Sequence, residues 1–183
     1  TSADPNIFLL ESAIPGTILD GKTGANFPID AATYRVLALR LYLPSASQAQ
    51  VFFSKGTIYS TNYSTSLVDV SPGWGVYFFD LASLASPNWS GTVDSLRLDP
   101  TQLSGQAIQL DWVRLVQPDA GLHRTVQWSG FTGAVDLFLD DDTDFANGTL
   151  GKVTSGAASS GTYDLFVGAL APGLYRVAVR PSS

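Results

Sequence analysis

An acidic segment in the second half of the chain has the residue types that bind a hard cation. Calcium takes about six to eight oxygen ligands, which carboxylate and amide side chains supply. The segment DDDTDFANG, residues 140–148, makes a structural calcium one candidate, although the twelfth position from Asp140 is Gly151 and not the glutamate of an EF-hand. The alternative is a solvated hairpin loop with local turn hydrogen bonds. The candidate ligands are Asp140, Asp142, Asp144 and Asn147.

Aromatic residues beside polar stretches form a second candidate site. A pyranose has a flat C–H face that stacks on an aromatic ring, while polar neighbours bind its hydroxyls. Trp74 and Tyr77 follow the segment SPG near the start of a predicted strand. Tyr59 and Tyr63 lie in the Ser/Thr-rich stretch GTIYSTNYSTS, which we expect to be a loop or an edge strand. These four residues are candidate sugar contacts, and the alternative is core aromatics plus a solubilising loop.

The segment WSGTVDSLRLDP, residues 89–100, places charges inside an apolar run. Because side chains alternate along a strand, Leu96 and Leu98 would face the core while Arg97 and Asp99 share the opposite face. Arg97 on an exposed sheet face could bind a ligand. The alternative is an ordinary ion pair, which contributes about 0–1 kcal/mol when exposed.

The chain offers little for catalysis. Its single histidine, His123, lies beside a predicted loop, and no G-x-S-x-G nucleophile elbow occurs. Acids such as Asp94 and Asp99 show no spacing that favours a glycosidase pair. We therefore expect no catalytic residues, and a polysaccharide hydrolase is the weakest of the functions considered.

Composition excludes several other functions. The 183 residues are 45% hydrophobic and carry a net charge of −6 with no basic run, which argues against nucleic-acid binding and against an anionic membrane surface. No apolar run approaches the roughly 18–20 residues of a membrane helix. The absence of cysteine excludes disulfides and cysteine-ligated zinc. Because methionine is absent even at position 1, we expect the chain to be a piece of a longer protein.

Short runs of apolar and β-branched residues that end at Pro, Gly, Ser or Asp predict an all-β chain. Only residues 80–86 and 30–34 could form short helices. The spacing of the runs is typical of β-sandwiches, and we expect two of them in tandem. The predicted strands are residues 34–44, 49–54, 74–81, 93–99, 107–116, 121–130, 133–142, 148–156, 161–170 and 172–181.

The segment QPDAG, residues 117–121, is the best linker signal. It predicts one domain over residues 1–117 and a second over residues 118–183. The second domain would have five strands where an immunoglobulin-type sandwich usually has about seven. It is therefore either truncated or completed by strands from elsewhere.

The ordered series YRVLALRLYLP, VYFFDLASL, WSGTVDSLRLDP and GQAIQLDWVRL spans much of the first predicted domain. It resembles bacterial extracellular jelly-roll domains of the galactose-binding-like, carbohydrate-binding-module type. In such modules an acid near the first strand and an acid on the last strand can share a calcium, and Glu11 and Asp111 match by position. The alternative is that Asp111 pairs with Arg40 or Arg114.

The segments VDLFLDDDTDFANGTLGKV and LAPGLYRVAV carry a second likeness. They resemble the immunoglobulin-like or fibronectin type III-like modules of bacterial secreted proteins, although an obvious final strand is lacking. This resemblance implies that the second domain is a spacer.

Together these observations predict a non-catalytic accessory region of a larger extracellular or cell-surface protein. Its partners would be the other domains of the parent chain and, if it binds a ligand, a polysaccharide or surface glycan. The competing hypothesis is a purely structural spacer or adhesion module. Because fold alone does not determine function, the choice depends on what covers the outward faces of the sheets.

Overall fold

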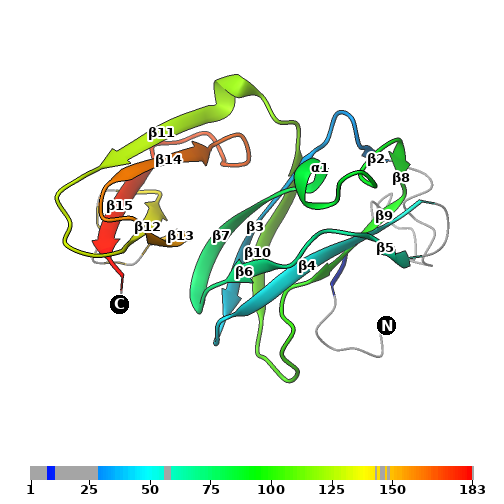
Figure 1. The fold of residues 1–183 in the computed structure, drawn as a ribbon, viewed down its shortest axis with the longest axis horizontal. Coiled ribbons are helices and arrows are strands. Elements are labelled where there is room, and N and C mark those ends of the chain that lie inside the picture. The colour runs from blue at the N-terminus through cyan, green and yellow to red at the C-terminus, as the bar shows by residue number, and fades with distance from the viewer. Residues whose placement is uncertain are drawn as a thin grey trace.

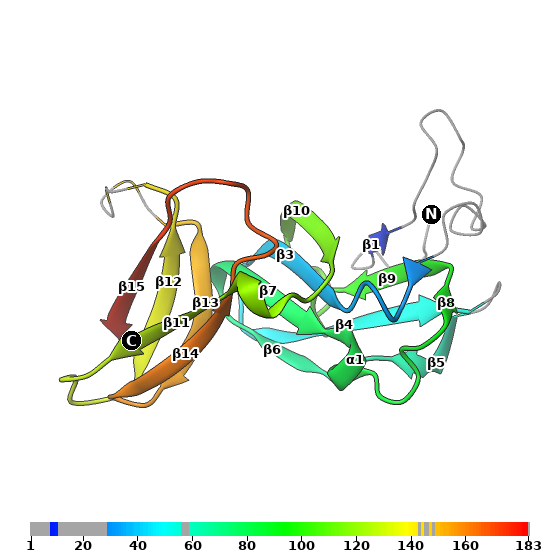
Figure 2. The ribbon, with the colours of Figure 1, turned by 90° about the horizontal axis from the view of Figure 1, so that it is seen from above.

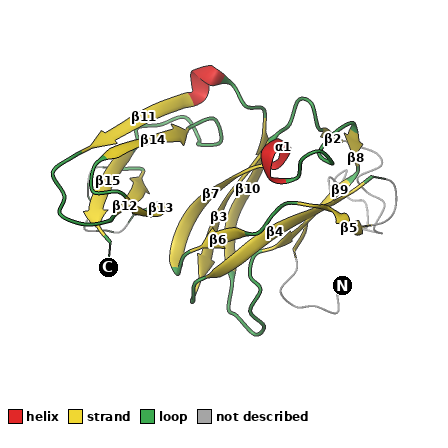
Figure 3. Cartoon of the chain, viewed as in Figure 1, coloured by secondary structure: helices red, strands yellow, loops and turns green. Residues whose placement is uncertain are grey.

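The computed structural model describes residues 8–10, 29–55, 59–142, 144, 147 and 149–182. These residues fold almost entirely into β-strands, as Figure 3 shows, so the predicted all-β class is confirmed. The described helices are one turn each, α1 (Leu81–Leu84) and the 3-10 helix η2 (Ala120–Leu122). Strands of the first and second halves of the chain gather at opposite ends of the long axis (Figure 1).

The first half of the chain forms a sandwich of two sheets. A two-stranded pair, β2 (Ile29–Asp30) with β8 (Thr92–Val93), lies beside them. The first sheet contains β1 (Phe8–Leu10), β9 (Ser95–Asp99), β4 (Ser47–Ser54) and β5 (Tyr59–Ser64), with β6 (Val68–Val70) paired to β4. The facing strands are β10 (Gln109–Val116), β3 (Val36–Leu43) and β7 (Gly73–Asp80).

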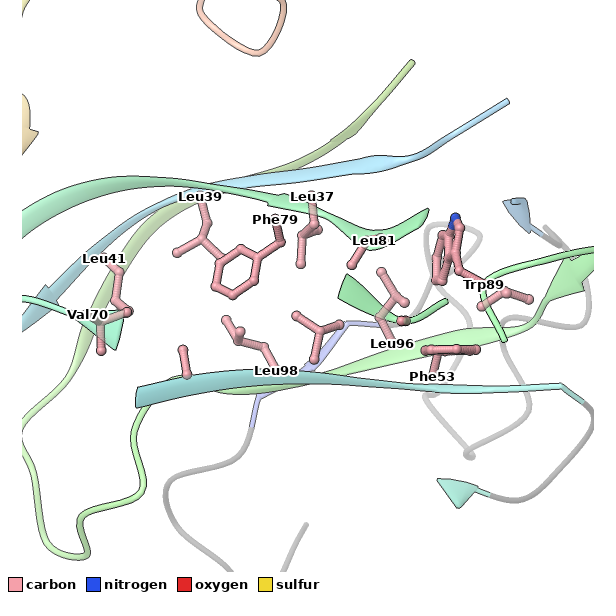
Figure 4. Close-up of a cluster of buried hydrophobic side chains, with 14 of the residues drawn as sticks. Leu37, Leu39, Leu41, Phe53, Val70, Phe79, Leu81, Trp89, Leu96 and Leu98 are labelled. Carbon is pink, nitrogen blue, oxygen red and sulfur yellow. The ribbon is translucent and has the colours of Figure 1, made fainter. Parts of the chain in front are cut away.

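The core of this sandwich follows from the alternation of side chains along each strand. In Figure 4 Leu39 and Phe79 point from β3 and β7 toward Leu98 and Phe53 of the facing sheet. Each of these four side chains is at most 1% exposed. Burying such a side chain contributes about 1.5–3 kcal/mol. Strand β3 is also buried on its other face, so that face must be covered by something else.

The predicted strand at residues 93–99 is in fact two short strands. Val93 ends β8 and is fully buried, whereas β9 begins at Ser95. Within β9 the prediction is confirmed, because Leu96 and Leu98 lie in the core. Because of the break, Val93 belongs to β8 and lies outside the alternation that places Arg97 on the outward face of β9.

The second half of the chain supplies five strands, each within or overlapping a predicted range. Strand β12 (Val135–Asp140) pairs on one side with β13 (Gly151–Ala157) and on the other with β15 (Arg176–Pro181). Strands β11 (His123–Trp128) and β14 (Gly161–Phe166) form a separate antiparallel pair (Figure 2).

One sheet continues through both halves of the chain. Its strand order is β10-β3-β7-β13-β12-β15, and β13 runs parallel to β7 with Lys152 opposite Gly75. The chain passes between the halves at η2, where the Asp119 carboxylate accepts a hydrogen bond from the Gly121 N–H. The domain boundary near residue 118 stays a prediction, but the second half is not a detached sandwich.

Candidate functional site

The outer face of the sheet formed by β10, β3 and β7 is covered by the second half of the chain. Val36 and Ala38 of β3 form a buried cluster with Phe166 and Ala169, all of them at most 8% exposed. The ring of Phe78 meets Phe166 edge-to-face, with centroids 5.9 Å apart. Such aromatic pairs contribute about 0.5–1.5 kcal/mol beyond their buried area. This apolar contact fixes one half of the chain against the other.

Two arginines on the same outer face bind backbone carbonyls across the junction. The Arg40 Nε–H donates to the Leu150 carbonyl at 2.5 Å, and its Nη1 binds Asp111 at 2.7 Å. Arg114 donates through Nη1 to the carbonyl of Ala169. Each arginine also lies over a tryptophan of its own half, at 4.1 Å for Arg40 and 4.8 Å for Arg114. The guanidinium groups are thereby held in place for the carbonyls they bind.

Glycines occupy positions 75 and 151, where the backbones of β7 and β13 approach closely at the junction. A Cβ on Gly151 would lie 2.9 Å from the Trp74 carbonyl oxygen and 3.0 Å from backbone atoms of Gly75. A Cβ on Gly75 would meet the Tyr77 ring at 2.4–2.5 Å. A side chain at position 151 would therefore push the two strands apart, whereas one at position 75 would clash with the Tyr77 ring of its own strand.

A cavity of about 260 Å³ lies where β7 and β13 diverge beyond their single paired position. The cavity is partly open to solvent, and residues of β6, β7, β13 and β14 line it. Its polar and aromatic lining comprises Asp69, Ser71, Tyr77, Phe78, Lys152, Thr154 and Tyr163.

Hydrogen bonds fix the two tyrosine rings of this cavity. The Tyr77 hydroxyl accepts from the Ser71 N–H at 3.0 Å and donates to the Ser71 carbonyl at 3.3 Å. The Tyr163 hydroxyl donates to the Val153 carbonyl at 3.4 Å. Burial raises the pKa of both phenols above the ordinary value, and for Tyr163 the neighbouring Asp164 charge raises the pKa further. Both hydroxyls therefore stay neutral in ordinary conditions.

The charged groups around the cavity differ in how many partners they have. The Lys152 ammonium binds Asp136 at 2.6 Å, and the carboxylate of Asp136 is only 5% exposed. The Asp69 carboxylate accepts through Oδ1 from the Gln48 amide at 2.9 Å. Its Oδ2 has no hydrogen-bond partner among the described residues. Among its described lining residues, the cavity therefore offers an acceptor to a ligand but no unpaired cation.

A second cavity, of about 210 Å³, lies on the other side of the junction. Trp112 and Tyr175 line it together with the carboxylates of Asp111 and Asp141. Asp111 already binds Arg40, and the Tyr175 hydroxyl donates to the Ala171 carbonyl at 2.9 Å.

The aromatic residues predicted to contact sugar do not form one surface. Trp74 packs against Tyr42 under the Arg40 guanidinium, so one of its ring faces is occupied. Tyr77 packs against the sandwich core and lines the first cavity. Because residues 74 and 77 are an odd number of positions apart on β7, their side chains point to opposite faces of the sheet.

The other predicted sugar contacts lie elsewhere. Tyr63 packs between Phe53, with ring centroids 5.6 Å apart, and the Lys55 ammonium, which lies 5.6 Å from its ring. Tyr59 begins β5, and its side chain lies outside the described residues.

Arg97 is occupied by groups of its own sheet. Its Nε and Nη2 donate to the two carboxylate oxygens of Asp99 at 2.9 and 2.8 Å. Its guanidinium lies 4.0 Å from the ring centroid of Phe52. The predicted pair of Arg97 and Asp99 on one outward face is confirmed, and its bidentate geometry leaves little of the guanidinium fork for a ligand.

The acidic loop is held together by its own hydrogen bonds. Asp142 accepts from the Asp144 N–H at 2.6 Å and from the Asn147 amide at 2.7 Å, one bond to each carboxylate oxygen. These bonds, the Asn147 bond foremost, lower the pKa of Asp142, and the nearby Arg176 charge also lowers it. Asp140 is buried at 1% exposure, and its Oδ2 has no partner among the described residues.

The second pair of predicted calcium ligands is not assembled in the described structure. Glu11 lies outside the described residues. Asp111 binds Arg40, which confirms the ion-pair alternative for that residue. Among the residues that the structure describes, no three acidic or histidine side chains are grouped so that they could hold a metal ion.

Sequence reasoning identified Tyr77 but missed the other groups around the first cavity. Asp69 lies within the three-residue strand β6 and Ser71 directly follows it, and so short a strand has no alternation to recognise. Thr154 and Tyr163 come from the other half of the chain and meet Tyr77 only because β13 joins β7. The sequence feature that could have pointed to this contact is the pair of glycines at positions 75 and 151, because glycine within a strand often marks a close approach of another backbone.

No family model, curated protein or solved structure matches the chain. The likeness to jelly-roll and immunoglobulin-like modules therefore stays a prediction. No helix in the described part of the chain has the length and apolar character needed to cross a membrane.

Proposed function

We propose that this chain is a non-catalytic accessory unit of a larger secreted or cell-surface protein, and that it acts as a rigid spacer between neighbouring parts. The observation that supports this proposal is the covering of the outer face of β10, β3 and β7 by the second half of the chain. That face carries Val36, Ala38 and Phe78, which pack on Phe166.

A spacer transmits a fixed distance only if its parts do not bend against one another. Domains joined by small polar interfaces usually move, because few contacts oppose the motion. This junction instead combines an apolar cluster, two arginine–carbonyl bonds and a strand pair. Bending would have to break all three together, which favours a single body.

The single histidine supports a structural role rather than a catalytic one. Nδ1 of His123 lies 2.8 Å from Asp164 Oδ2, and its ring packs on Phe166 with centroids 5.1 Å apart. The same phenylalanine forms the apolar cluster of the junction. His123 and Asp164 thus stabilise the position of Phe166, the residue that packs the second half of the chain against the first.

Nuclear spin relaxation tests the proposal directly. We expect the backbone amides of residues 36–116 and residues 123–181 to report one rotational diffusion tensor. The Phe166→Ala variant should loosen the junction, because truncating a buried Phe costs about 3–5 kcal/mol. The matched control is Leu174→Ala, since Leu174 is 89% exposed. Separate diffusion tensors for the two halves of the unmodified chain would overturn the rigid-spacer proposal.

A further inference from the structure

We infer that the cavity in the fork between β7 and β13 binds one neutral pyranose ring, as at the end of a glycan. This goes beyond the spacer role, although it rests on the fixed junction proposed above. The fork exists because the two strands pair where Lys152 lies opposite Gly75 and diverge afterwards. The site therefore needs both halves of the chain.

The size of the cavity sets the size of the ligand. Its volume of about 260 Å³ is below the roughly 300–1,000 Å³ of sites for drug-sized ligands. It therefore fits one ring and excludes a chain of rings lying along the sheet. Because the cavity is partly open, a terminal residue can enter it while the rest of a glycan stays in solvent.

The walls are arranged in advance for a ring with apolar and polar faces. Tyr77 and Tyr163 supply aromatic surface, and both hydroxyls are tied to backbone groups. Because these rings are already fixed, a ligand does not have to order them, which lowers the entropic cost of binding. Aromatic surface beside polar groups suits the C–H face of a pyranose.

The polar groups of the cavity match neutral hydroxyls. Asp69 Oδ2 can accept a charge-assisted hydrogen bond, which is about twice as strong as a neutral one. The hydroxyls of Ser71 and Thr154 can each donate and accept. A sugar hydroxyl also does both, so it can bind all three groups at once.

The charges argue against an anionic ligand. Lys152 is engaged by Asp136 at 2.6 Å, so it does not offset the negative charge of Asp69. The whole chain carries a net charge of −6. An anion entering the cavity would be repelled by Asp69 and would find no unpaired cation among the described lining residues.

Titration followed by amide chemical shifts tests this inference. The probes are methyl glycosides of glucose, galactose, mannose and N-acetylglucosamine, and a trisaccharide that ends in each sugar. We expect saturable shifts at residues 68–71, 77–78 and 152–154 for at least one glycoside. The matching trisaccharide should bind with similar affinity, because only its terminal ring enters the cavity.

Matched variants locate the binding. The double variant Asp69→Asn with Thr154→Val keeps the side-chain shapes and should weaken binding by about tenfold or more, because it removes the negative charge of the Asp69 acceptor and the hydroxyl of Thr154. The controls are Asp141→Asn and Thr125→Val, both exposed and outside this cavity. If the double variant loses the dispersed spectrum of a folded protein, Thr154→Val alone serves in its place.

Three outcomes would overturn the inference. The first is that no glycoside gives saturable shifts. The second is that Asp141→Asn loses as much affinity as the double variant does. The third is that tetramethylammonium or glucuronate binds more tightly than the neutral glycosides. Relaxation of the same samples separates this failure from that of the spacer. If the two halves report one diffusion tensor but no sugar binds, only the sugar site is rejected. If they report two diffusion tensors, the fixed junction is rejected as well.

Discussion

The Arg40 Nε–H donates a hydrogen bond of 2.5 Å to the Leu150 carbonyl and so joins strand β3 to the second half of the chain. The Arg40 side chain is only 18% exposed, and its guanidinium is also bound by Asp111 and stacked over Trp74. A charged donor in so confined a place binds a carbonyl more strongly than a neutral donor does.

Removing this donor should therefore destabilise the protein. We expect Arg40→Ala to lower the free energy of unfolding by about 1.5–3 kcal/mol, because a hydrogen bond to a charged group is lost and the Leu150 carbonyl is left without it. Urea denaturation measures the change. The control is Arg124→Ala, whose guanidinium is exposed and binds carbonyls only within its own segment, at Gly121 and His123. An equal loss in both variants would contradict the role given to Arg40.

The close approach of β7 and β13 predicts that Gly151→Ala disrupts the junction. The added Cβ would lie 2.9 Å from the Trp74 carbonyl oxygen, and backbone atoms cannot move aside as a flexible side chain can. We expect a loss of about 1–3 kcal/mol in the free energy of unfolding, as in other overpacked sites.

The control for this prediction is Gly133→Ala, because a Cβ there would have no atom within 4 Å. Its stability should stay the same or rise by up to about 1 kcal/mol, since alanine restricts the unfolded chain. Thermal or urea unfolding of both variants gives the comparison. A Gly151→Ala variant as stable as the control would show that the junction tolerates a wider spacing.

The strands were predictable because the apolar pattern is local. The run VLALRLYL in β3 alternates in sequence, and its four leucines are at most 1% exposed in the structure. The all-β class followed from many such runs. In β8 and β9 the local pattern was insufficient, because the break at Asp94 moves Val93 onto a different strand pair.

The site was less predictable because it depends on contacts between distant residues. Trp74 was singled out as an aromatic residue near a loop, yet Arg40 from a neighbouring strand covers its ring. No local sequence feature indicates that Tyr163 lines this cavity, because the pairing of β13 with β7 is not evident from the sequence. The alternation of side chains along one strand does not reveal which strands of the two halves are neighbours in a sheet.

The acidic loop predicts a specific shift of one carboxyl group. Because the Asn147 amide donates to Asp142, Asn147→Ala should raise the pKa of Asp142 toward its ordinary value. A carboxyl with a lowered pKa stabilises the folded state above its ordinary pKa of about 3.9, and this contribution is lost as the pH falls. Carboxyl chemical shifts measured against pH give the value.

A second carboxyl provides the control for this titration. Thr33 donates to Asp30 and is the main cause of the lowered pKa of that residue. Thr33→Val should therefore raise the pKa of Asp30 and leave that of Asp142 unchanged. If Asn147→Ala leaves the pKa of Asp142 unchanged, the hydrogen bond seen in the structure is not formed in solution.

Removal of calcium should not change the melting temperature. Both carboxylate oxygens of Asp142 already accept hydrogen bonds, and Arg176 supplies positive charge nearby. A cation would have to displace the Asn147 amide and would be repelled by the guanidinium. Melting curves in EDTA and in millimolar calcium test this expectation, because a ligand of the folded state raises the midpoint. A midpoint raised by calcium and not by magnesium would establish the metal site, with the unpartnered Asp140 Oδ2 as its first candidate ligand.

The two tyrosines of the cavity predict a loss of stability at alkaline pH. Burial raises the pKa of Tyr77 and Tyr163 in the folded state, whereas in the unfolded chain both ionise near the ordinary value of about 10. Below that pH both phenols are protonated in the folded and the unfolded state, so they add no pH dependence to the free energy of unfolding. Above it the unfolded chain loses protons first, and the free energy of unfolding falls as the pH rises toward the folded pKa. Urea denaturation at a series of alkaline pH values should show this fall, and Tyr77→Phe with Tyr163→Phe should reduce its slope. A slope that both variants leave unchanged would mean that these phenols are as accessible to solvent as in the unfolded chain.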